Sequence, residues 1–187
     1  LLNRLRDQLE QRGTLDVLRH GIELLGLKQP LKLAEFKPAL AINADILARY
    51  ATFRSNLGDH ERASEVIQRA VALDPLNART FRSQGDIRHN AGDHAGAISA
   101  YAKAIELNPT LAGVNASMGF AQLLAGANDE ARASFQKERS AVRRLPGLAI
   151  LAHRAGDKAA AAKALADLMA EYGDKSHYQY AQVHAQW

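Results

Sequence analysis

Cysteine is missing from this 187-residue sequence. Its absence excludes disulfide frameworks, thiolate zinc sites and cysteine nucleophiles, and a cysteine-free chain fits a reducing compartment. Long apolar runs are missing too, because none approaches the roughly 18 residues that a membrane-spanning helix needs. The N-terminal residues alternate leucine with charge, unlike a signal peptide. We therefore expect a cytoplasmic protein that does not insert into a membrane.

Motifs that carry catalysis or phosphate binding are absent as well. The sequence contains no Walker-type loop and no GxGxxG, HExxH or GxSxG pattern. His89 and His94 lie five residues apart with no third ligand nearby. His177 and His184 would lie two helical turns apart, about 10.5 Å, which is too far to hold one ion without further ligands. The sequence therefore predicts no enzyme, no metal site and no cofactor.

A strong charge bias is also lacking. The formal net charge is +4, with seven basic and five acidic residues in 1–43 and seventeen basic and fifteen acidic residues in 44–187. No basic block forms a candidate phosphate-binding surface. Nucleic acid is therefore not an expected partner.

What the sequence does contain is an internal repeat. NLGDHERASEVIQRAVALDP, residues 56–75, aligns with NAGDHAGAISAYAKAIELNP, residues 90–109, at an offset of 34 residues, with glycine, aspartate, alanine and proline in register. A third copy has Gly126 at the same offset, and a fourth has Gly156, about four residues early. A period of about 20 to 50 residues is the signature of a solenoid, in which each unit packs on its neighbours.

The repeat resembles the tetratricopeptide repeat (TPR), whose consensus places small residues at positions 8, 20 and 27, a large apolar residue at 24 and proline at 32. Counting starts at Ala44, Ala78 and Ala112. Position 8 is occupied by Ala51, Gly85 and Gly119 in the three repeats. Position 20 is occupied by Ala63, Ala97 and Ala131, and position 24 by Ile67, Tyr101 and Phe135. Small residues let two antiparallel helices approach closely, and the large one fills the gap toward the next repeat. The resemblance implies an all-α helical solenoid that acts as a protein-interaction scaffold.

The same counting divides the chain into an N-terminal segment, 1–43, and a TPR array, 44–187. The array is expected to consist of repeats 44–77, 78–111, 112–141 and 142–175 and a partial repeat 176–187.

The third repeat departs from the consensus. Glu138 stands at position 27 and Arg143 stands where proline is expected. We expect the regular stacking of helices to loosen at this junction, because a large charged residue replaces a small one.

The C-terminal end also departs from a complete repeat. Residues 145–187 resemble the tails of repeat arrays found downstream of signalling or DNA-binding domains in bacterial regulators, and this resemblance implies a bacterial protein. The last predicted helix lacks its partner, so Tyr178, Tyr180 and Trp187 either cap or expose an apolar end. A homodimer through that end stays open. Because the chain opens on Leu1 and stops within a helical pattern, we expect a fragment or fusion of something longer.

Residues 1–43 do not fit the repeat, and their pattern predicts two helices and an extended arm between Pro30 and Pro38. The stretch RDQLEQRGTLDVLRHGIELLGLKQPLKLAEFKPALAINADILARYA, residues 6–51, resembles the N-terminal stretch of type I restriction enzyme R subunits. Nothing after Ala51 resembles the nuclease domain of that family. The resemblance implies an alternative function, as an accessory fragment of a DNA-processing complex without nuclease activity.

The TPR resemblance also implies where a ligand would bind, because positions 2, 5, 9, 12 and 13 of the first helix of each repeat line the concave groove. The candidate groove residues are Arg79, Arg82, Asp86, His89, Asn90, Phe120, Leu124, Arg143, His153 and Arg154. An extended peptide with an acidic group near Arg79 and Arg82 and an apolar anchor near Phe120 and Leu124 would complement them. The alternative is that the arginines are simply solvated and that Phe120 and Leu124 pack on the next repeat.

Overall fold

The computed structural model describes residues 44–186. The helices and extended arm predicted for residues 1–43, and Trp187, lie outside the described residues. Residues 44–186 form nine α-helices and one 3₁₀ turn, with no strand among them. The first five helices are α4 (Ala44–Asn56), α5 (His60–Leu73), α6 (Ala78–Asn90), α7 (His94–Leu107) and α8 (Val114–Leu124). The remaining elements are α9 (Asn128–Lys137), α10 (Ala141–Arg154), α11 (Lys158–Tyr172), η1 (Gly173–Ser176) and α12 (His177–His184).

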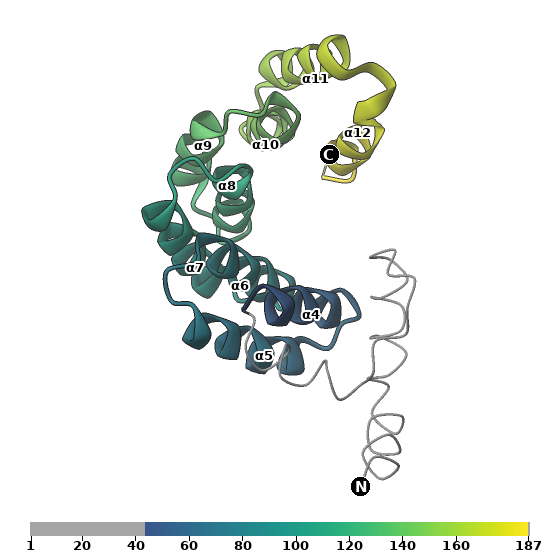
Figure 1. The fold of residues 1–187 in the computed structure, drawn as a ribbon. Helices are drawn as coiled ribbons and strands as arrows, with labels where there is room; N and C mark the ends of the chain where they lie inside the picture. The colour runs from purple at the N-terminus through teal and green to yellow at the C-terminus, as the bar shows by residue number, and fades with distance from the viewer. Residues whose placement is uncertain (1–43, 187) are drawn as a thin grey trace, which may run out of the picture. The chain divides into compact units, whose positions relative to one another are not determined.

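The helices stack as antiparallel pairs along a curved array (Figure 1). Helices α4, α6, α8, α10 and α12 lie on the inner side of the curve, and α5, α7, α9 and α11 lie on the outer side. Each inner helix contacts the next inner helix. The predicted all-α TPR solenoid is therefore confirmed, and its inner helices together form a concave face.

The turns inside the helix pairs follow from a recurring Gly-Asp dipeptide. Gly58 and Gly92 adopt φ values of 82° and 81°, a left-handed conformation that costs little only for glycine. Asp59 and Asp93 follow as N-caps, and their side chains accept hydrogen bonds from the backbone N–H of Arg62 and Gly96 at 3.3 and 2.9 Å. The dipeptide thus ends one helix and begins the next in reverse direction.

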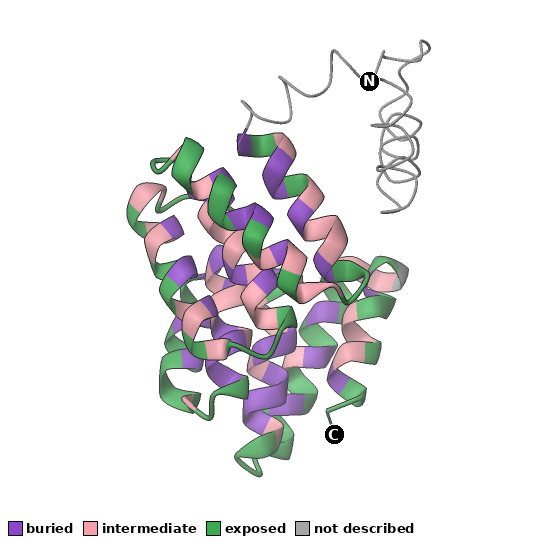
Figure 2. Ribbon diagram, turned by 90° about the horizontal axis from the view of Figure 1, so that it is seen from below, coloured by how far each residue is buried: buried purple, intermediate pink, exposed green. Residues whose placement is uncertain are grey.

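The core repeats at the predicted positions, and Figure 2 shows buried residues recurring along each helix. The alanines at position 20 are almost fully buried: Ala63, Ala97, Ala131 and Ala161. The large residues at position 24 are also buried: Ile67, Tyr101, Phe135 and Leu165. The two helices of a pair approach closely where the small alanine side chain lies between them. One large side chain fills the remaining space.

Glycine at position 8 accompanies an aromatic residue at position 24. A Cβ atom on Gly85 would overlap the ring of Tyr101, and one on Gly119 would lie 2.8 Å from Cε1 of Phe135. In the first repeat, alanine is accommodated at position 8 because Ile67 takes the place of the ring. The size of the residue at position 24 therefore decides whether position 8 can carry a side chain.

The junction between the third and fourth helix pairs is built around Glu138. Its side chain is 3% exposed. Oε2 accepts a hydrogen bond from the backbone N–H of Ala116 at 3.3 Å, and Oε1 accepts one from Ser140 at 3.1 Å. These N–H groups lie at the starts of α8 and α10, which make no side-chain cap of their own. One carboxylate therefore supplies acceptors, and a favourable negative charge, to two helix N-termini.

The stacking, which the sequence predicts to loosen at this junction, is shortened there but not interrupted. Helix α9 ends early, at Lys137, but a single apolar cluster continues from α8 to α12 across the junction. The cluster includes Phe135, Ile150, Leu165 and Val183. The spacing shortens because Glu138 turns the chain directly into α10, and the apolar packing compensates for the lost turn of helix.

The C-terminal helix α12 closes the apolar cluster with Val183, which is fully buried. Tyr180 donates a hydrogen bond from its hydroxyl to the carbonyl oxygen of Leu165 at 3.2 Å, whereas Tyr178 is 75% exposed. Tyr180 therefore helps to cap the apolar end, whereas Tyr178 is exposed. Within residues 44–186, no helix has the length and apolar content needed to span a membrane.

Candidate peptide-binding groove

A groove of about 430 Å³ lies on the concave face. Its lining comes from the inner helices, together with one residue of the outer helix α7: Thr52, Asn56, Asp86, Ile87, His89, Asn90, Tyr101, Ser117, Phe120, Leu123, Leu124, Ile150, Gln182 and Gln186. Its volume falls in the range of about 300 to 1,000 Å³ that is typical of ligand sites.

The groove follows a simple helical register. Pairs of residues four apart project from one face of an inner helix, because residues i and i+4 share a face. The pairs are Thr52 and Asn56 on α4, Asp86 and Asn90 on α6, and Phe120 and Leu124 on α8. Gln182 on α12 and Gln186, just after that helix ends at His184, also line the groove. Most of the inner helices therefore present one such pair to the groove.

Five of the ten predicted residues line the groove. They are Asp86, His89, Asn90, Phe120 and Leu124. The other five, Arg79, Arg82, Arg143, His153 and Arg154, do not. Position explains three of the five, because Arg79, Arg82 and Arg143 stand at positions 2 and 5, one or two turns from the positions that line the groove. His153 and Arg154 stand at positions 12 and 13, as His89 and Asn90 do, but Ile150 is the residue of α10 that lines the groove.

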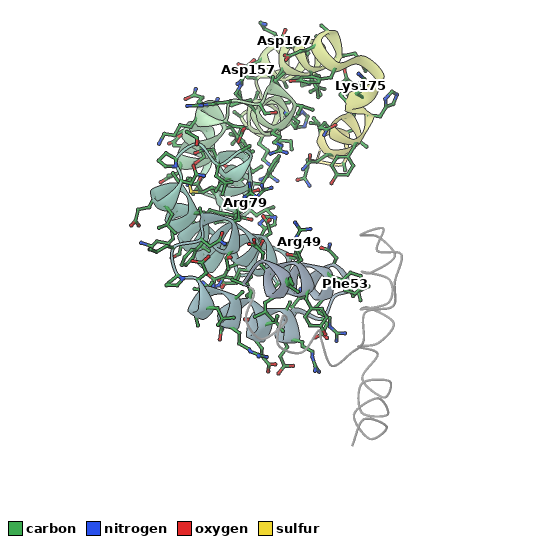
Figure 3. All side chains as sticks on the ribbon, in the orientation of Figure 1. Arg49, Phe53, Arg79, Asp157, Asp167 and Lys175 are labelled. Atoms are coloured by element: carbon green, nitrogen blue, oxygen red, sulfur yellow. The ribbon has the colours of Figure 1, made fainter. Side chains whose placement is uncertain are left out.

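Two of the predicted arginines connect neighbouring helices. Arg82 Nη1 donates a hydrogen bond to the carbonyl oxygen of Ala112 at 3.1 Å. Arg154 Nη2 donates to Oε1 of Gln186 at 2.9 Å, and its Nη1 lies 3.4 Å from the carbonyl oxygen of Leu123. These contacts give both arginines a structural role next to the groove. Arg79 is exposed on α6 (Figure 3).

Several groove residues were missed by sequence reasoning. Gln182 and Gln186 were missed because they fall at positions 7 and 11 of the partial repeat 176–187, outside the positions expected to line the groove. Tyr101 was missed because position 24 is a core position. Its ring crosses the core over Gly85, and its hydroxyl emerges at Asp86 on the groove side.

Asp86 lies among groups that act on the pKa of its carboxyl in opposite directions. Its Oδ1 accepts a hydrogen bond from the Tyr101 hydroxyl at 2.8 Å, and Oδ2 lies 3.8 Å from Nε of Arg82. Burial raises the pKa of the Asp86 carboxyl, and the hydrogen bond from Tyr101 and the charge of Arg82 only partly offset that effect. Burial and the neighbouring Asp86 raise the pKa of Tyr101, so that its hydroxyl stays protonated as a donor.

His89 lies beside His94, with ring centroids 5.3 Å apart. Burial lowers the pKa of His89, and the neighbouring His94 lowers it further, so His89 is neutral at neutral pH. In residues 44–186, no cluster of three or more histidine, aspartate or glutamate residues could hold a metal ion.

One wall of the groove is apolar. Phe120 is half-buried and packs edge-on against Phe135, with ring centroids 4.9 Å apart. Leu124 is 50% exposed and lies one turn further along α8. The groove thus combines an apolar wall from α8 with a polar wall from α4, α6 and α12, an arrangement that suits a ligand with both kinds of group.

The comparisons with known proteins agree with this architecture. A family model described as "Tetratricopeptide repeat" matches residues 44–75 and 83–111. No curated protein matches the sequence.

Three solved structures show the fold over longer stretches. A thermophilic TPR protein from Thermus thermophilus is 20% identical, with a TM-score of 0.68, over 98% of this chain and 95% of that chain. MamA from Desulfovibrio magneticus RS-1 is 17% identical, with a TM-score of 0.65, over 89% and 90% of the two chains. PilW, a widely conserved type IV pilus biogenesis factor, is 19% identical, with a TM-score of 0.63, over 73% and 67%.

The chain therefore contains tetratricopeptide repeats and has the fold of a TPR solenoid. The family match falls on the first two helix pairs, and the structural likeness extends it to the remainder of the described array. The comparisons do not show the resemblance of residues 6–51 to restriction enzyme subunits.

Proposed function

We propose that this protein is a scaffold whose concave groove binds an extended segment of a partner protein. Tetratricopeptide repeats generally mediate protein–protein interactions. A solenoid can do so because its inner helices form one continuous surface, on which specificity depends on a few side chains.

The observation that carries this proposal is the exposed apolar wall inside the groove. Leu124 is half exposed although it stands in a concave surface, beside the ring of Phe120. An apolar side chain from a partner would remove both from water and would act as an anchor in the centre of the interface.

The predicted acidic group of the partner would bind outside the groove, along one edge of the concave face. Arg79 and Arg82 lie in the first half of α6, and Arg143 lies in the first turn of α10 with its guanidinium against Gly113. This part of the proposal rests on charge alone.

The alternative function, as an accessory fragment of a DNA-processing complex, has no observation in the described residues that favours it. A non-enzymatic role, a cytoplasmic location, a bacterial source and a homodimer through the C-terminal end stay predictions.

The proposal can be tested by affinity capture from a bacterial lysate, read by mass spectrometry. The Leu124→Gln variant should lose a partner that the unaltered chain captures, because the substitution removes the apolar anchor. Leu73→Gln is the matched control, since Leu73 is 48% exposed, close to the 50% of Leu124, and stands at the end of the outer helix α5.

A partner retained by all three proteins would place binding outside the groove. In a parallel capture, the Arg79→Glu, Arg82→Glu double variant tests the acidic group. Loss of the partner from this variant, with unchanged circular dichroism, supports an acidic group at the arginine edge.

A further inference from the structure

The groove carries one formal charge. Among its fourteen lining residues, Asp86 is the only aspartate, glutamate, lysine or arginine. The others are apolar side chains, amides, hydroxyls and His89, whose lowered pKa keeps it neutral. A ligand in the groove therefore meets a single negative charge in a partly desolvated setting.

The Asp86 carboxylate keeps one oxygen available. Oδ1 accepts the hydrogen bond from Tyr101, but Oδ2 accepts none from the residues that the structure describes. Arg82 Nε forms an ion pair with Oδ2 at 3.8 Å, which is beyond hydrogen-bond distance, and the same guanidinium donates a hydrogen bond to the carbonyl oxygen of Ala112. Because burial raises the pKa of Asp86, its charge is incompletely compensated, and a further cation would stabilise it.

A second acceptor lies one helical turn away. Asn90 Nδ2 donates a hydrogen bond to Oγ of Ser55 at 3.2 Å, which leaves the amide oxygen of Asn90 free to accept. Asp86 and Asn90 are four residues apart on α6 and share its groove face. Together they present two oxygen acceptors to one ligand group.

The apolar wall suits the remainder of a basic side chain. Lysine and arginine bury their methylene stems along apolar surfaces and keep the charged head among polar groups. Phe120 and Leu124 provide such a surface in the same groove. The ring of Phe120 can also attract a cation through its π face.

We infer that the groove binds a lysine or arginine side chain of the partner segment, with the charged head at Asp86 and Asn90 and the stem along Phe120 and Leu124. This inference rests on the proposed peptide-binding function. An acidic side chain would be repelled by Asp86, and a neutral amide would add no positive charge to that of Arg82 beside the carboxylate.

The arginines adjoining the groove donate no hydrogen bond to Asp86. Arg82 forms an ion pair with Oδ2 of Asp86, but its hydrogen bond goes to the carbonyl oxygen of Ala112. Arg154 is held by Gln186 and the carbonyl oxygen of Leu123. Oδ2 of Asp86 can therefore still accept a hydrogen bond from a ligand.

The test uses the full chain and an array of immobilised hexapeptides, in which one position is fixed as each amino acid in turn and the others are randomised. Lysine and arginine should be selected at one position. Asp86→Asn should lower that selection about tenfold, because a charge-assisted hydrogen bond becomes a neutral one. The variant keeps an oxygen that can accept the Tyr101 hydrogen bond, so the helix packing should persist.

A matched control is Asp167→Asn on the outer helix α11. It changes the net charge equally and removes only an exposed ion pair with Lys163. It should leave the selection unchanged. Asn90→Asp gives the opposite test, since a second carboxylate at the site should strengthen the selection for lysine and arginine several-fold.

The outcomes separate this inference from the proposed function. Basic selection that survives Asp86→Asn, or peptide binding that depends on Leu124 but shows no preference for basic residues, would overturn the inference and leave groove binding intact. If no hexapeptide signal is reduced by Leu124→Gln, both are overturned. Basic selection lost in Asp86→Asn and retained in Asp167→Asn supports both.

Discussion

Residues 44–111 and residues 112–186 both stack paired helices, but they differ in how the helix N-termini are capped and in the residue at position 27. The first two helix pairs keep alanine at positions 20 and 27 and cap their outer helices with Asp59 and Asp93. In the second part, α8, α9 and α10 have no side-chain cap of their own, and a buried Glu138 takes position 27. The family match stops at residue 111, yet the apolar core continues to α12.

This comparison teaches that position 27 requires burial without an unpaired polar group, rather than a small residue as such. Ala70 and Ala104 meet the requirement because their side chains are buried and contain no polar group that needs a hydrogen-bond partner. Glu138 meets it because two backbone N–H groups converge on its carboxylate. The same position thus tolerates a charge only where helix N-termini are available.

The largest expected effect on stability comes from placing glutamate, the residue found at position 27 of the third repeat, at the same position in residues 44–111. Ala104→Glu buries a carboxylate at a fully buried position without helix N-termini to receive it, and should cost about 3–5 kcal/mol of unfolding free energy. Urea denaturation followed by circular dichroism measures the loss. Near-native stability would show that any repeat can accommodate the charge, and would remove the distinction between the halves.

The reciprocal change restores the consensus residue in the irregular half. Glu138→Ala should still destabilise, by roughly 2–4 kcal/mol, because it leaves the N–H groups of Ala116 and Ser140 without their acceptor. Glu138→Gln should lose less, since one side-chain oxygen remains. Urea denaturation followed by circular dichroism measures both losses. A Glu138→Ala variant more stable than the unaltered chain would contradict the role assigned to the carboxylate.

A third prediction concerns the pairing of glycine with an aromatic ring. Gly85→Ala should cost roughly 1–3 kcal/mol by overpacking against Tyr101. In a Tyr101→Leu background the same substitution should cost much less, because the first repeat combines alanine with an aliphatic residue at these positions. A double-mutant cycle measures the coupling. Equal costs in both backgrounds would show that the ring does not impose the glycine.

The smallest expected effect is a shift in the pKa of His89, which concerns a difference between the two regular repeats. Ser55 and His60 in the first repeat correspond to His89 and His94 in the second. The pKa of His89 should fall below its ordinary value of 6.5, mainly through burial and then through His94. His94→Gln should raise it only part of the way back, because the burial remains. Two-dimensional NMR titration of the imidazole signals gives the midpoints.

The stability consequence of this shift has a definite sign. The unfolded chain binds a proton at His89 more readily than the folded chain, so this contribution to stability falls as pH drops from 6.5 towards the folded pKa. A His89 midpoint above the ordinary value in the unaltered chain would contradict both the burial and the sign.

The candidate site was predictable only in part. The register from Ala78 placed Asp86, His89 and Asn90 on the concave face, and the register from Ala112 did the same for Phe120 and Leu124. It failed for Arg79 and Arg82, because a linear register states which face a residue shares but not how far along the helix a groove extends.

The sequence by itself determined the solenoid, because small residues at fixed positions encode contacts between neighbouring helices, and those contacts are local. The tertiary structure alone decided which side chains from different helices meet. Within single repeats these are the Tyr101 hydroxyl at Asp86 and the Glu138 carboxylate between two helix N-termini, and across repeats they are Gln182 and Gln186 in the groove. The first two contacts depend on how the paired helices are oriented, and the glutamines depend on the curvature accumulated over several helix pairs.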